Sequence, residues 1–406
     1  MTDQKKKALK IIVLFGLVSL FGDMVYEAAR SVNGPYLKTL GANAAIVGLV
    51  AGIAEFLGYA IRLASGYFAD KTKAYWLFTF LGYGLLVSVP LLALTGIWQV
   101  AVIFIIMERL GKAIRSPAKD TILSQATKQV GTGIGFAIAE ALDQVGAIIG
   151  PLIFSVLFML LGKGDKALAD YQHGYALLWI PLVLVISFIV FAYRSVPDPE
   201  SLEISVIKSP EKDKLSKVFW IYTIFTFVTT LGFANFALVG YHFKATHVLT
   251  DAQIPLFYAV AMGVDALAAL AIGKAYDVFK SRRDNEKAGL ITLIAIPVFS
   301  LFIPVFVFST KFSFAVAGVI IWGIVMGAHE TVMKSAIADL TPLKKRGTGY
   351  GIFNTAYGLS VFIGSAVTGL LYEHSILAVI IISVAMEAAA IPLFFVLKNK
   401  ALTARV

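Results

Sequence analysis

Twelve long apolar runs dominate this sequence. They lie at roughly residues 9–31, 45–68, 75–95, 98–117, 133–161, 174–193, 218–240, 254–277, 289–309, 313–337, 349–372 and 376–397. Each is close to the roughly 20 residues that a helix needs to cross a bilayer, where every backbone N–H and C=O must be paired within the segment. We therefore predict an all-α membrane protein with twelve transmembrane helices. A mean hydropathy of +0.82 and 58% apolar residues exclude a soluble enzyme and a disordered chain.

Most of the positive charge falls on one side of these runs. The formal net charge is +10, and 23 of the 35 Lys and Arg residues occupy connections on the side of the N-terminus, against 5 on the other side. Cytoplasmic connections carry such an excess. We therefore place both termini in the cytoplasm and expect this charge to face anionic lipid rather than nucleic acid. The first run lacks a small-residue cleavage site after it, so we interpret it as a retained helix and not as a signal peptide.

The chain also shows a division into two similar halves. The polar segment 195–217 joins the sixth and seventh runs and contains three prolines and many charges, which is typical of a solvated linker. A Gly-Thr-Gly-x-Gly pattern occurs at 131–135 and again 216 positions later at 347–351. We predict an N-terminal six-helix bundle at 1–194, a cytoplasmic linker at 195–217 and a C-terminal six-helix bundle at 218–406. Parallel repeats of this kind place a substrate site between the halves near mid-membrane.

Ionisable residues are distributed unevenly over the runs. The runs at 75–95, 174–193 and 289–309 have none, and the run at 376–397 has only Glu387, so we expect these helices to face lipid. Asp265 and Glu387 stand alone in apolar helices, where a hydrogen-bonding role is as plausible as a transport role. Fourteen further ionisable residues within the runs are the candidates for proton coupling or substrate binding: Asp23, Glu27, Arg30, Glu55, Arg62, Glu108, Arg109, Lys112, Arg115, Glu140, Asp143, His329, Glu330 and Lys334.

Helical spacing orders two groups of these candidates into stripes. Asp23, Glu27 and Arg30 stand at i, i+4 and i+7, and residues 108, 112 and 115 repeat that spacing. A carboxyl group in a low-dielectric, water-filled cavity can exchange protons between the two sides of a membrane. We therefore interpret the set as a proton-titrating and substrate-binding network. Permanent ion pairs that close a gate or lock helices together are the alternative.

Several motifs resemble a known family. Residues 66–71, Gly-Tyr-Phe-Ala-Asp-Lys, look like its signature between helices 2 and 3, with a degenerate second copy from Gly273 to Asp277. Gly146 through Gly150 and Pro151 resemble its antiporter signature in helix 5. On these residues the chain resembles the major facilitator superfamily over its whole length. The stretches 21–37 and 108–120 look like a poorly characterised prokaryotic branch of it.

The resemblance implies specific roles for some residues. Gly66 and Asp70 would hold the second helix against the eleventh on the cytoplasmic side, and helices 1, 4, 7 and 10 would line the cavity. Arg109 fits the fourth-helix arginine that this family ties to proton coupling. The sequence departs from the family pattern after Asp70, where Lys-Thr-Lys-Ala replaces a glycine and paired arginines. From packing alone, Gly146 and Gly150 are equally a small-xxx-small surface for close helix contact.

Other motifs lead to weaker hypotheses. His329 and Glu330 begin like a zinc-protease motif, but Met333 occupies the place of the second histidine, so we expect no metal site. His329 is then a proton relay, a ligand for a transported cation or a hydrogen-bonded pore residue. Aromatic residues that either surround an amphipathic substrate or only pack are Phe21, Tyr26, Tyr59, Phe233, Phe236, Trp322 and Tyr357.

Together these patterns predict a secondary active transporter of the cytoplasmic membrane. The leading hypothesis is proton-coupled efflux of a small organic solute by alternating access. The first alternative is uptake or exchange of an anionic metabolite, favoured by the basic residues Arg62, Lys112, Arg115 and Lys334. The second alternative is lipid or lysolipid translocation. We expect no enzymatic activity, because no constellation of nucleophile and base is visible. We also expect no cofactor, no nucleic-acid partner and a monomer in contact with membrane lipid.

Overall fold

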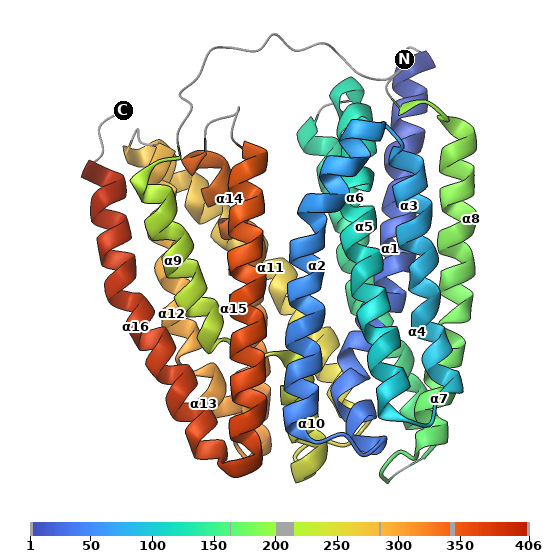
Figure 1. The fold of residues 1–406 in the computed structure, drawn as a ribbon, viewed down its shortest axis with the longest axis vertical. Helices are drawn as coiled ribbons and strands as arrows, with labels where there is room; N and C mark the ends of the chain where they lie inside the picture. Colours follow the sequence, from blue (N-terminus) through green and yellow to red (C-terminus); the bar gives the residue numbers. More distant parts are fainter. Residues whose placement is uncertain are drawn as a thin grey trace. The chain divides into compact units, whose positions relative to one another are not determined.

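The computed structural model describes residues 3–130, 132–162, 164–199, 215–283, 286–341 and 346–403. Every predicted run is mainly helical there, and no strand occurs among the described residues, which confirms the all-α class (Figure 1). Most of the predicted linker at 195–217 lies outside the described residues, as do the side chains of Lys128 and Lys334.

Seven predicted runs each correspond to one continuous helix: α1 (Asp3–Thr39), α2 (Ala44–Thr72), α5 (Trp98–Val130), α6 (Thr132–Leu160), α11 (Gln253–Arg283), α14 (Phe312–Leu340) and α15 (Arg346–His374). The last run is also continuous, as α16 (Ile376–Thr403). The remaining four runs are built from shorter helices. The run at 75–95 consists of α3 (Tyr75–Gly84), η1 (Leu85–Val87), α4 (Ser88–Leu91) and η2 (Leu92–Leu94), and the run at 174–193 consists of α7 (Leu168–Leu177) and α8 (Trp179–Ser195). The run at 218–240 consists of α9 (Lys217–Gly232) and α10 (Phe236–Thr246), and the run at 289–309 consists of η4 (Glu286–Ile294), α12 (Ala295–Ser300) and α13 (Ile303–Val307).

Eleven helical segments of the described chain are long and apolar enough to cross a membrane. The twelfth predicted crossing is α5. Every stretch of 18 residues in this helix contains at least four charged residues. Helix α5 is therefore too charged to qualify on composition alone. Its ionisable residues require partners on neighbouring helices, because charges are costly in hydrocarbon.

The first helix does not break where its sequence predicts an interruption. Asn33, Gly34 and Pro35 favour a bent or broken end of the first run, yet α1 continues through them to Thr39. A proline removes one backbone donor, which leaves one carbonyl of the preceding turn without its helical partner. The hydroxyl of Thr39 donates to the carbonyl of Pro35 at 3.0 Å, which satisfies one carbonyl of the last turn. The helix is thus bent at most, because its helical assignment is continuous from Asp3 to Thr39.

The chain forms two compact units, each described here by itself. Unit 1 comprises Met1–Gly41, Leu57–Lys208 and Asp251–Ala259, and unit 2 comprises Ala42–Phe56, Ser209–Thr250 and Val260–Val406. In unit 1, α1 packs against α5, α6 and α8, and α3 packs against α5. In unit 2, α9 packs against α15 and α16. The predicted bundle boundaries at 194 and 218 stay a prediction.

The two units repeat one close helix contact. A Cβ atom on Gly146 of α6 would collide with the carbonyl oxygen of Leu20 on α1, and a Cβ atom on Gly364 of α15 would collide with that of Leu231 on α9. Each pair thus joins the fifth crossing of its half to the first. This correspondence agrees with an internal repeat of one helical arrangement.

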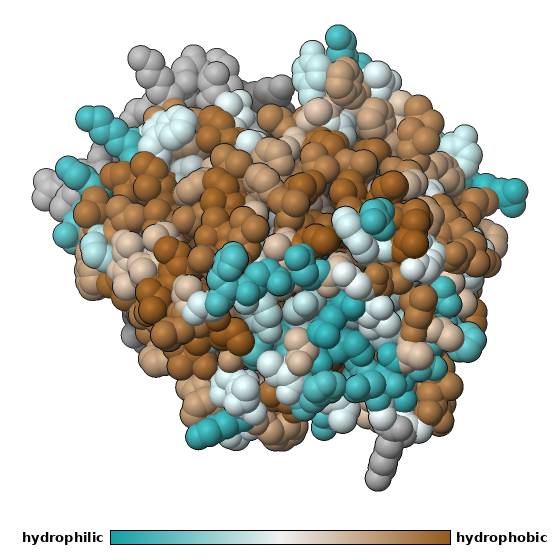
Figure 2. Space-filling model, turned by 60° about the horizontal axis from the view of Figure 1, so that its bottom comes forward, coloured by the Kyte–Doolittle hydropathy of each residue, from teal (hydrophilic) through white to brown (hydrophobic). Residues whose placement is uncertain are grey.

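Large apolar side chains are exposed on the helices that were expected to face lipid. Examples are Leu81 on α3, Ile180 on α8 and Ile381 on α16, which are 53%, 65% and 60% exposed. Figure 2 shows hydrophobic residues over much of the visible surface. Such apolar exposure is unfavourable in water but suits contact with lipid.

Candidate functional site

Helix α1 carries the first predicted stripe of ionisable side chains. Glu27 is 6% exposed, whereas Asp23 and Arg30 are half-buried. Arg30 Nη1 lies 3.7 Å from Glu27 Oε1, an ion pair within the stripe. Asp23 is within electrostatic reach of Lys112 on α5 and of Asp143 on α6. The stripe therefore faces the neighbouring helices of unit 1.

Helix α5 carries the second stripe and buries it. Glu108, Arg109 and Arg115 are 5%, 8% and 5% exposed. The carboxylate of Glu108 lies 3.6 Å from Arg109 Nε and 4.0 Å from Arg115 Nη2. Charge-assisted hydrogen bonds are shorter, about 2.7–2.9 Å, so these are ion pairs without hydrogen bonds. Among the described residues, Glu108 Oε1 and Arg115 Nη1 are buried without a hydrogen-bond partner.

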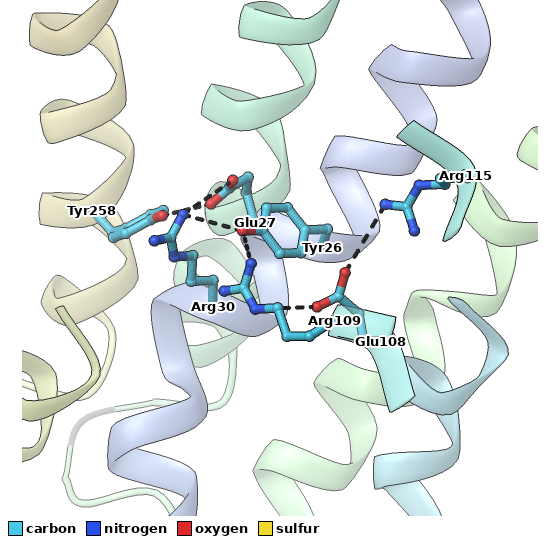
Figure 3. A network of polar contacts seen from close by, with 7 residues as sticks. All are labelled: Tyr26, Glu27, Arg30, Glu108, Arg109, Arg115 and Tyr258. Atoms are coloured by element: carbon cyan, nitrogen blue, oxygen red, sulfur yellow. Dashed lines mark hydrogen bonds and ion pairs between the residues drawn. The ribbon is translucent and has the colours of Figure 1, made fainter. Parts of the chain in front are cut away.

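Tyr26 joins the two stripes, as Figure 3 shows. Its hydroxyl accepts a hydrogen bond from Arg30 Nη1 at 3.2 Å and another from Arg109 Nη1. Its ring centroid lies 4.5 Å from the guanidinium carbon of Arg109, 5.8 Å from that of Arg30 and 3.8 Å from Lys112 Nζ. All three cations are within the roughly 6 Å over which a ring attracts a cation. One buried tyrosine thus holds three positive side chains together.

Tyr258 of α11 extends this network to a helix far along the chain. Its hydroxyl donates to Glu27 Oε2 at 2.5 Å (Figure 3). Both side chains are buried, at 0% and 6% exposure, so the bond is shielded from competing water. The carboxylate of Glu27 therefore contacts Arg30 through one oxygen and Tyr258 through the other.

A small pocket lies beside this network, between α1, α4, η2 and α5. Its polar lining consists of Tyr26, Arg30, Asn33, Glu108 and Arg109. The apolar walls are Ala29, Val89, Leu92 and Ile105. Asn33 is held in place by Tyr175, whose hydroxyl donates to Asn33 Oδ1 at 2.9 Å. Two guanidinium groups and one carboxylate therefore surround a space of about 10 Å³, which is enough for about one water molecule.

The structure brings most of the candidates on the first and fourth crossings into one cluster within unit 1. Together on α1 and α5 lie Asp23, Glu27, Arg30, Glu108, Arg109, Lys112 and Arg115, with Asp143 of α6 within electrostatic reach of Asp23. Helical spacing predicted each stripe. Their roles in coupling and binding stay predictions.

Three other candidates of the N-terminal half lie elsewhere. Glu55 is half-buried on the part of α2 that belongs to unit 2. Arg62, also on α2, stacks its guanidinium over the Tyr59 ring at 5.0 Å, and its Nε is buried without a hydrogen-bond partner among the described residues. Glu140 is exposed on α6. The positions of these three residues in the sequence did not indicate that they would lie outside the cluster.

The candidates of the C-terminal half lie on α14 in unit 2. His329 is 4% exposed, and its Nδ1 lies 3.5 Å from the hydroxyl of Tyr357. Glu330 is half-buried. The side chain of Lys334 lies outside the described residues, so the predicted basic set of Arg62, Lys112, Arg115 and Lys334 is placed only in part.

The conformational motifs have local contacts of their own. A Cβ on Gly66 would stand 3.3 Å from Pro117 of α5, and the exposed Asp70 accepts a hydrogen bond from Tyr75 at 3.2 Å. In the second copy, a Cβ on Gly273 would stand 3.0 Å from Thr331 of α14, and Asp277 is exposed. The cytoplasmic latch that the family resemblance implies for Gly66 and Asp70 stays a prediction.

The glycine motif of α6 sits against α1. A Cβ on Gly150 would stand 2.5 Å from the carbonyl oxygen of Met24, and Gly146 meets Leu20 one turn earlier. Pro151 is buried within α6, which continues through it to Leu160. The motif therefore functions at least as a close-packing surface, directly behind the stripe that carries Asp23 and Glu27.

Sequence reasoning missed several members of the site. Tyr258 has no charge or motif that marks it, and the pairing with Glu27 spans 231 positions. Tyr83 lies under the guanidinium of Arg115 at 4.7 Å from its ring centroid. Asn33 was noticed only as a helix breaker. Tyr26 was named among the candidate aromatic residues, but its hydrogen bonds to Arg30 and Arg109 were not predicted.

The fold and this cluster define a multi-pass membrane transporter built from helices with ionisable residues buried inside. The family model of the Major Facilitator Superfamily matches residues 14–365 and 249–405. The chain belongs to the major facilitator superfamily, and the resemblance noted in its motifs is confirmed.

Relatives agree with this family. An uncharacterised protein of Mycobacterium tuberculosis is 37% identical over 397 residues, covering 96% of this chain and 93% of that protein. An uncharacterised MFS-type transporter of Methanocaldococcus jannaschii is 26% identical over 383 residues, covering 92% and 91%. The crystal structure of a POT family transporter in complex with 5-aminolevulinic acid has the same fold, with a TM-score of 0.75 at 11% identity over 96% of each chain. The chain is thus a secondary transporter.

Proposed function

We propose that this transporter couples the movement of protons to the export of a small organic solute across the cytoplasmic membrane. The proposal includes cytoplasmic termini and two six-helix bundles, at 1–194 and 218–406, joined by the segment 195–217. Glu27 and Asp23 are the proton-binding groups, with Asp143 and Glu330 as secondary carboxylates. Arg109 and Arg115 are their charge partners.

The main support for this proposal is that both carboxylate oxygens of Glu27 have a partner. One carboxylate oxygen faces Arg30 and the other accepts the hydroxyl of Tyr258 on another helix. Protonation removes the negative charge and with it the attraction to Arg30, which frees that guanidinium for another partner. A carboxyl group that changes its contacts on two helices when it binds a proton is suited to coupling.

The loose ion pairs of α5 favour a working network over a permanent lock. Glu108 is separated from Arg109 and Arg115 by 3.6 and 4.0 Å, beyond hydrogen-bond range. A lock that must survive burial needs tight, hydrogen-bonded pairs, because desolvation of both charges opposes it. The pairs seen here can be rearranged by a proton or a ligand with little loss of hydrogen bonding.

A thermal-shift screen of small organic solutes at two pH values provides the first test. A solute that competes with the proton stabilises the wild-type protein more strongly at the higher pH. In Glu27→Gln the dependence of this stabilisation on pH should become weaker, since Asp23 remains. The solute identified is then followed in proteoliposomes with an imposed pH gradient, where Asp23→Asn and Glu27→Gln should abolish gradient-driven movement.

The matched control is Asp120→Asn, which removes one carboxylate from an exposed position of α5. It should retain the pH dependence of the wild-type protein. Proton coupling through the α1 stripe would be wrong if Asp23→Asn and Glu27→Gln both transported the solute at the wild-type rate under the same gradient. Correct insertion of each variant is checked by its elution as a single species in detergent.

A second candidate, exchange of an organic anion, is favoured by the basic residues around the small pocket beside the cluster. Arg30 and Arg109 line it together with Asn33, and guanidinium groups bind carboxylates and phosphates through paired hydrogen bonds. If this candidate is correct, organic anions raise the melting temperature of the wild-type protein, and Arg109→Gln and Arg115→Ala lose this effect. Equal stabilisation by neutral and anionic solutes would exclude it.

A further inference from the structure

The seventh crossing is interrupted in unit 2. Helix α9 ends at Gly232 and α10 begins at Phe236, and residues 233–235 between them are not helical. Non-helical backbone at membrane depth is tolerated where it lies inside the protein or lines a cavity. Here two side chains complete its hydrogen bonds: Trp322 Nε1 donates to Ala234 O at 2.9 Å, and Asn235 Oδ1 accepts from Ala237 N at 2.9 Å.

The ring of Phe233, on this interruption, lies between two aromatic residues of α14. Its centroid is 5.8 Å from that of Trp322, with the planes 25° apart, and 5.2 Å from that of His329. Trp322 and His329 are seven residues apart, which corresponds to about 10.5 Å along a helix. The space between them is therefore one aromatic ring thick, and Phe233 fills it.

This filling leaves one polar atom unsatisfied. His329 is 4% exposed, and its Nε2 is buried without a hydrogen-bond partner among the described residues. Its other nitrogen, Nδ1, lies 3.5 Å from the hydroxyl of Tyr357. A phenylalanine ring has no atom that can bond to Nε2, and buried polar groups without partners are unfavourable.

The space between Trp322 and His329 is called the slot below, and its two sides differ in how closely they are packed. Helix α14 packs tightly on α11, because Cβ atoms on Gly323 and Gly327 would stand 2.5 Å from the carbonyl oxygens of Ala261 and Asp265. Phe233 instead belongs to the non-helical segment, whose backbone is not fixed by a helical ladder. The Phe233 side chain can leave the slot by rotation about its own bonds, because a phenyl ring makes no hydrogen bond, whereas Trp322 Nε1 is bonded to Ala234 O.

We propose that the slot between Trp322 and His329 binds a planar aromatic part of the substrate that carries a hydrogen-bonding ring atom or hydroxyl group. Such a ring takes the place of Phe233, stacks on Trp322 and bonds to His329 Nε2. This inference rests on the proposed transport function and deepens it, since it names the chemical class of the solute as heteroaromatic or phenolic.

Three bicyclic probes of similar size test the slot: naphthalene, quinoline and 2-naphthol. Quinoline adds a ring acceptor, and 2-naphthol adds a hydroxyl that serves either tautomer of His329. Binding is measured from the change in tryptophan fluorescence of the protein in lipid nanodiscs when a probe is added. Empty nanodiscs give the correction for partition of the probe into lipid. The part of the change that is lost in Trp322→Phe is the signal of Trp322. We expect quinoline or 2-naphthol to bind about 3- to 10-fold more tightly than naphthalene, the contribution of one hydrogen bond.

Two variants separate the hydrogen bond from the stacking. His329→Phe keeps a ring and removes Nε2, so the preference for the polar probe should fall to about 1-fold while naphthalene still binds. Phe233→Ala vacates the slot, so all three probes should bind more tightly than to the wild-type protein. If His329→Phe fails to fold, the comparison of the three probes on the wild-type protein and on Phe233→Ala decides the question alone.

The proposal is overturned if neither polar probe is preferred by the wild-type protein, if the preference persists in His329→Phe, or if Trp322→Phe leaves the signal unchanged. These outcomes are distinct from failure of proton coupling. Loss of pH-driven transport in Glu27→Gln with no ring binding would leave the proposed function standing and this inference refuted.

Discussion

Replacing Gly150 by alanine tests how tightly α6 packs on α1. A Cβ at this position would stand 2.5 Å from Met24 O and 2.9 Å from Met24 Cα, whereas real Cβ atoms essentially never approach other atoms closer than 3.0 Å. The obstacle is a backbone atom, which cannot rotate away as a side chain can. The two helices must therefore separate by about 0.5 Å, the difference between the 2.5 Å contact to Met24 O and the 3.0 Å limit. Overpacking of this kind costs about 1–3 kcal/mol.

An opposing term reduces this cost. Alanine in place of glycine inside a helix stabilises it by up to about 1 kcal/mol. We therefore expect Gly150→Ala to lose about 1–2 kcal/mol of unfolding free energy, measured by titration with a denaturing detergent in mixed micelles. Gly58→Ala on α2 is the matched control, because no atom lies within 4 Å of its added Cβ, and it should gain up to about 1 kcal/mol.

The comparison of these two variants can refute the reasoning. If Gly150→Ala were as stable as Gly58→Ala, the close approach of α1 and α6 would not constrain the fold. The same pair addresses the antiporter interpretation of the motif. A pure packing role predicts that correctly folded Gly150→Ala transports at the wild-type rate, whereas a role in coupling predicts slower transport per folded molecule.

Three further predictions concern other contacts. Tyr258→Phe removes the hydrogen bond to Glu27, so it should lower the free energy of unfolding by about 1.5–3 kcal/mol and alter the pH dependence of solute binding. Unchanged values would show that this hydrogen bond contributes neither to stability nor to coupling. Gly41→Ala forces a φ of +90° on a residue with a side chain and should cost about 1–2 kcal/mol in the same detergent titration, although no atom obstructs its Cβ. Lys280→Ala breaks a 2.7 Å ion pair with Asp339 whose side chains are only 27% and 18% exposed, so it should cost about 1.5–3 kcal/mol in that titration; a loss of less than about 0.5 kcal/mol would show that the pair behaves like a solvent-exposed one.

The sequence predicts the helices of this chain well, because the bilayer leaves the backbone few alternatives. All twelve runs are found, and the i, i+4, i+7 spacing on α1 and α5 placed two stripes that the structure brings together. The break that Asn33, Gly34 and Pro35 favour does not occur, and α1 continues through them to Thr39. A proline near a helix end disturbs fewer hydrogen bonds than one in the middle.

The parts that could not be predicted depend on contacts between distant segments. Nothing in the neighbourhood of Tyr258 indicates that its hydroxyl meets Glu27, because helical periodicity orders residues on one helix and not between two. The same limit applies to Phe233, whose position between Trp322 and His329 follows from a three-residue interruption that apolar composition does not mark.

The concentration of charge on α5 has a consequence for biosynthesis. On scales measured for helix insertion, a basic residue near a helix centre opposes entry into the membrane by about 2.5–3.5 kcal/mol, so Arg109, Lys112 and Arg115 together present a barrier of roughly 8–10 kcal/mol to α5 alone. The groups that receive these cations, Tyr26 on α1 and Tyr83 on α3, are translated earlier. Helix α5 is therefore expected to leave the translocon only in company with its predecessors, and truncated chains ending after α5 should insert it only when α1 and α3 are present.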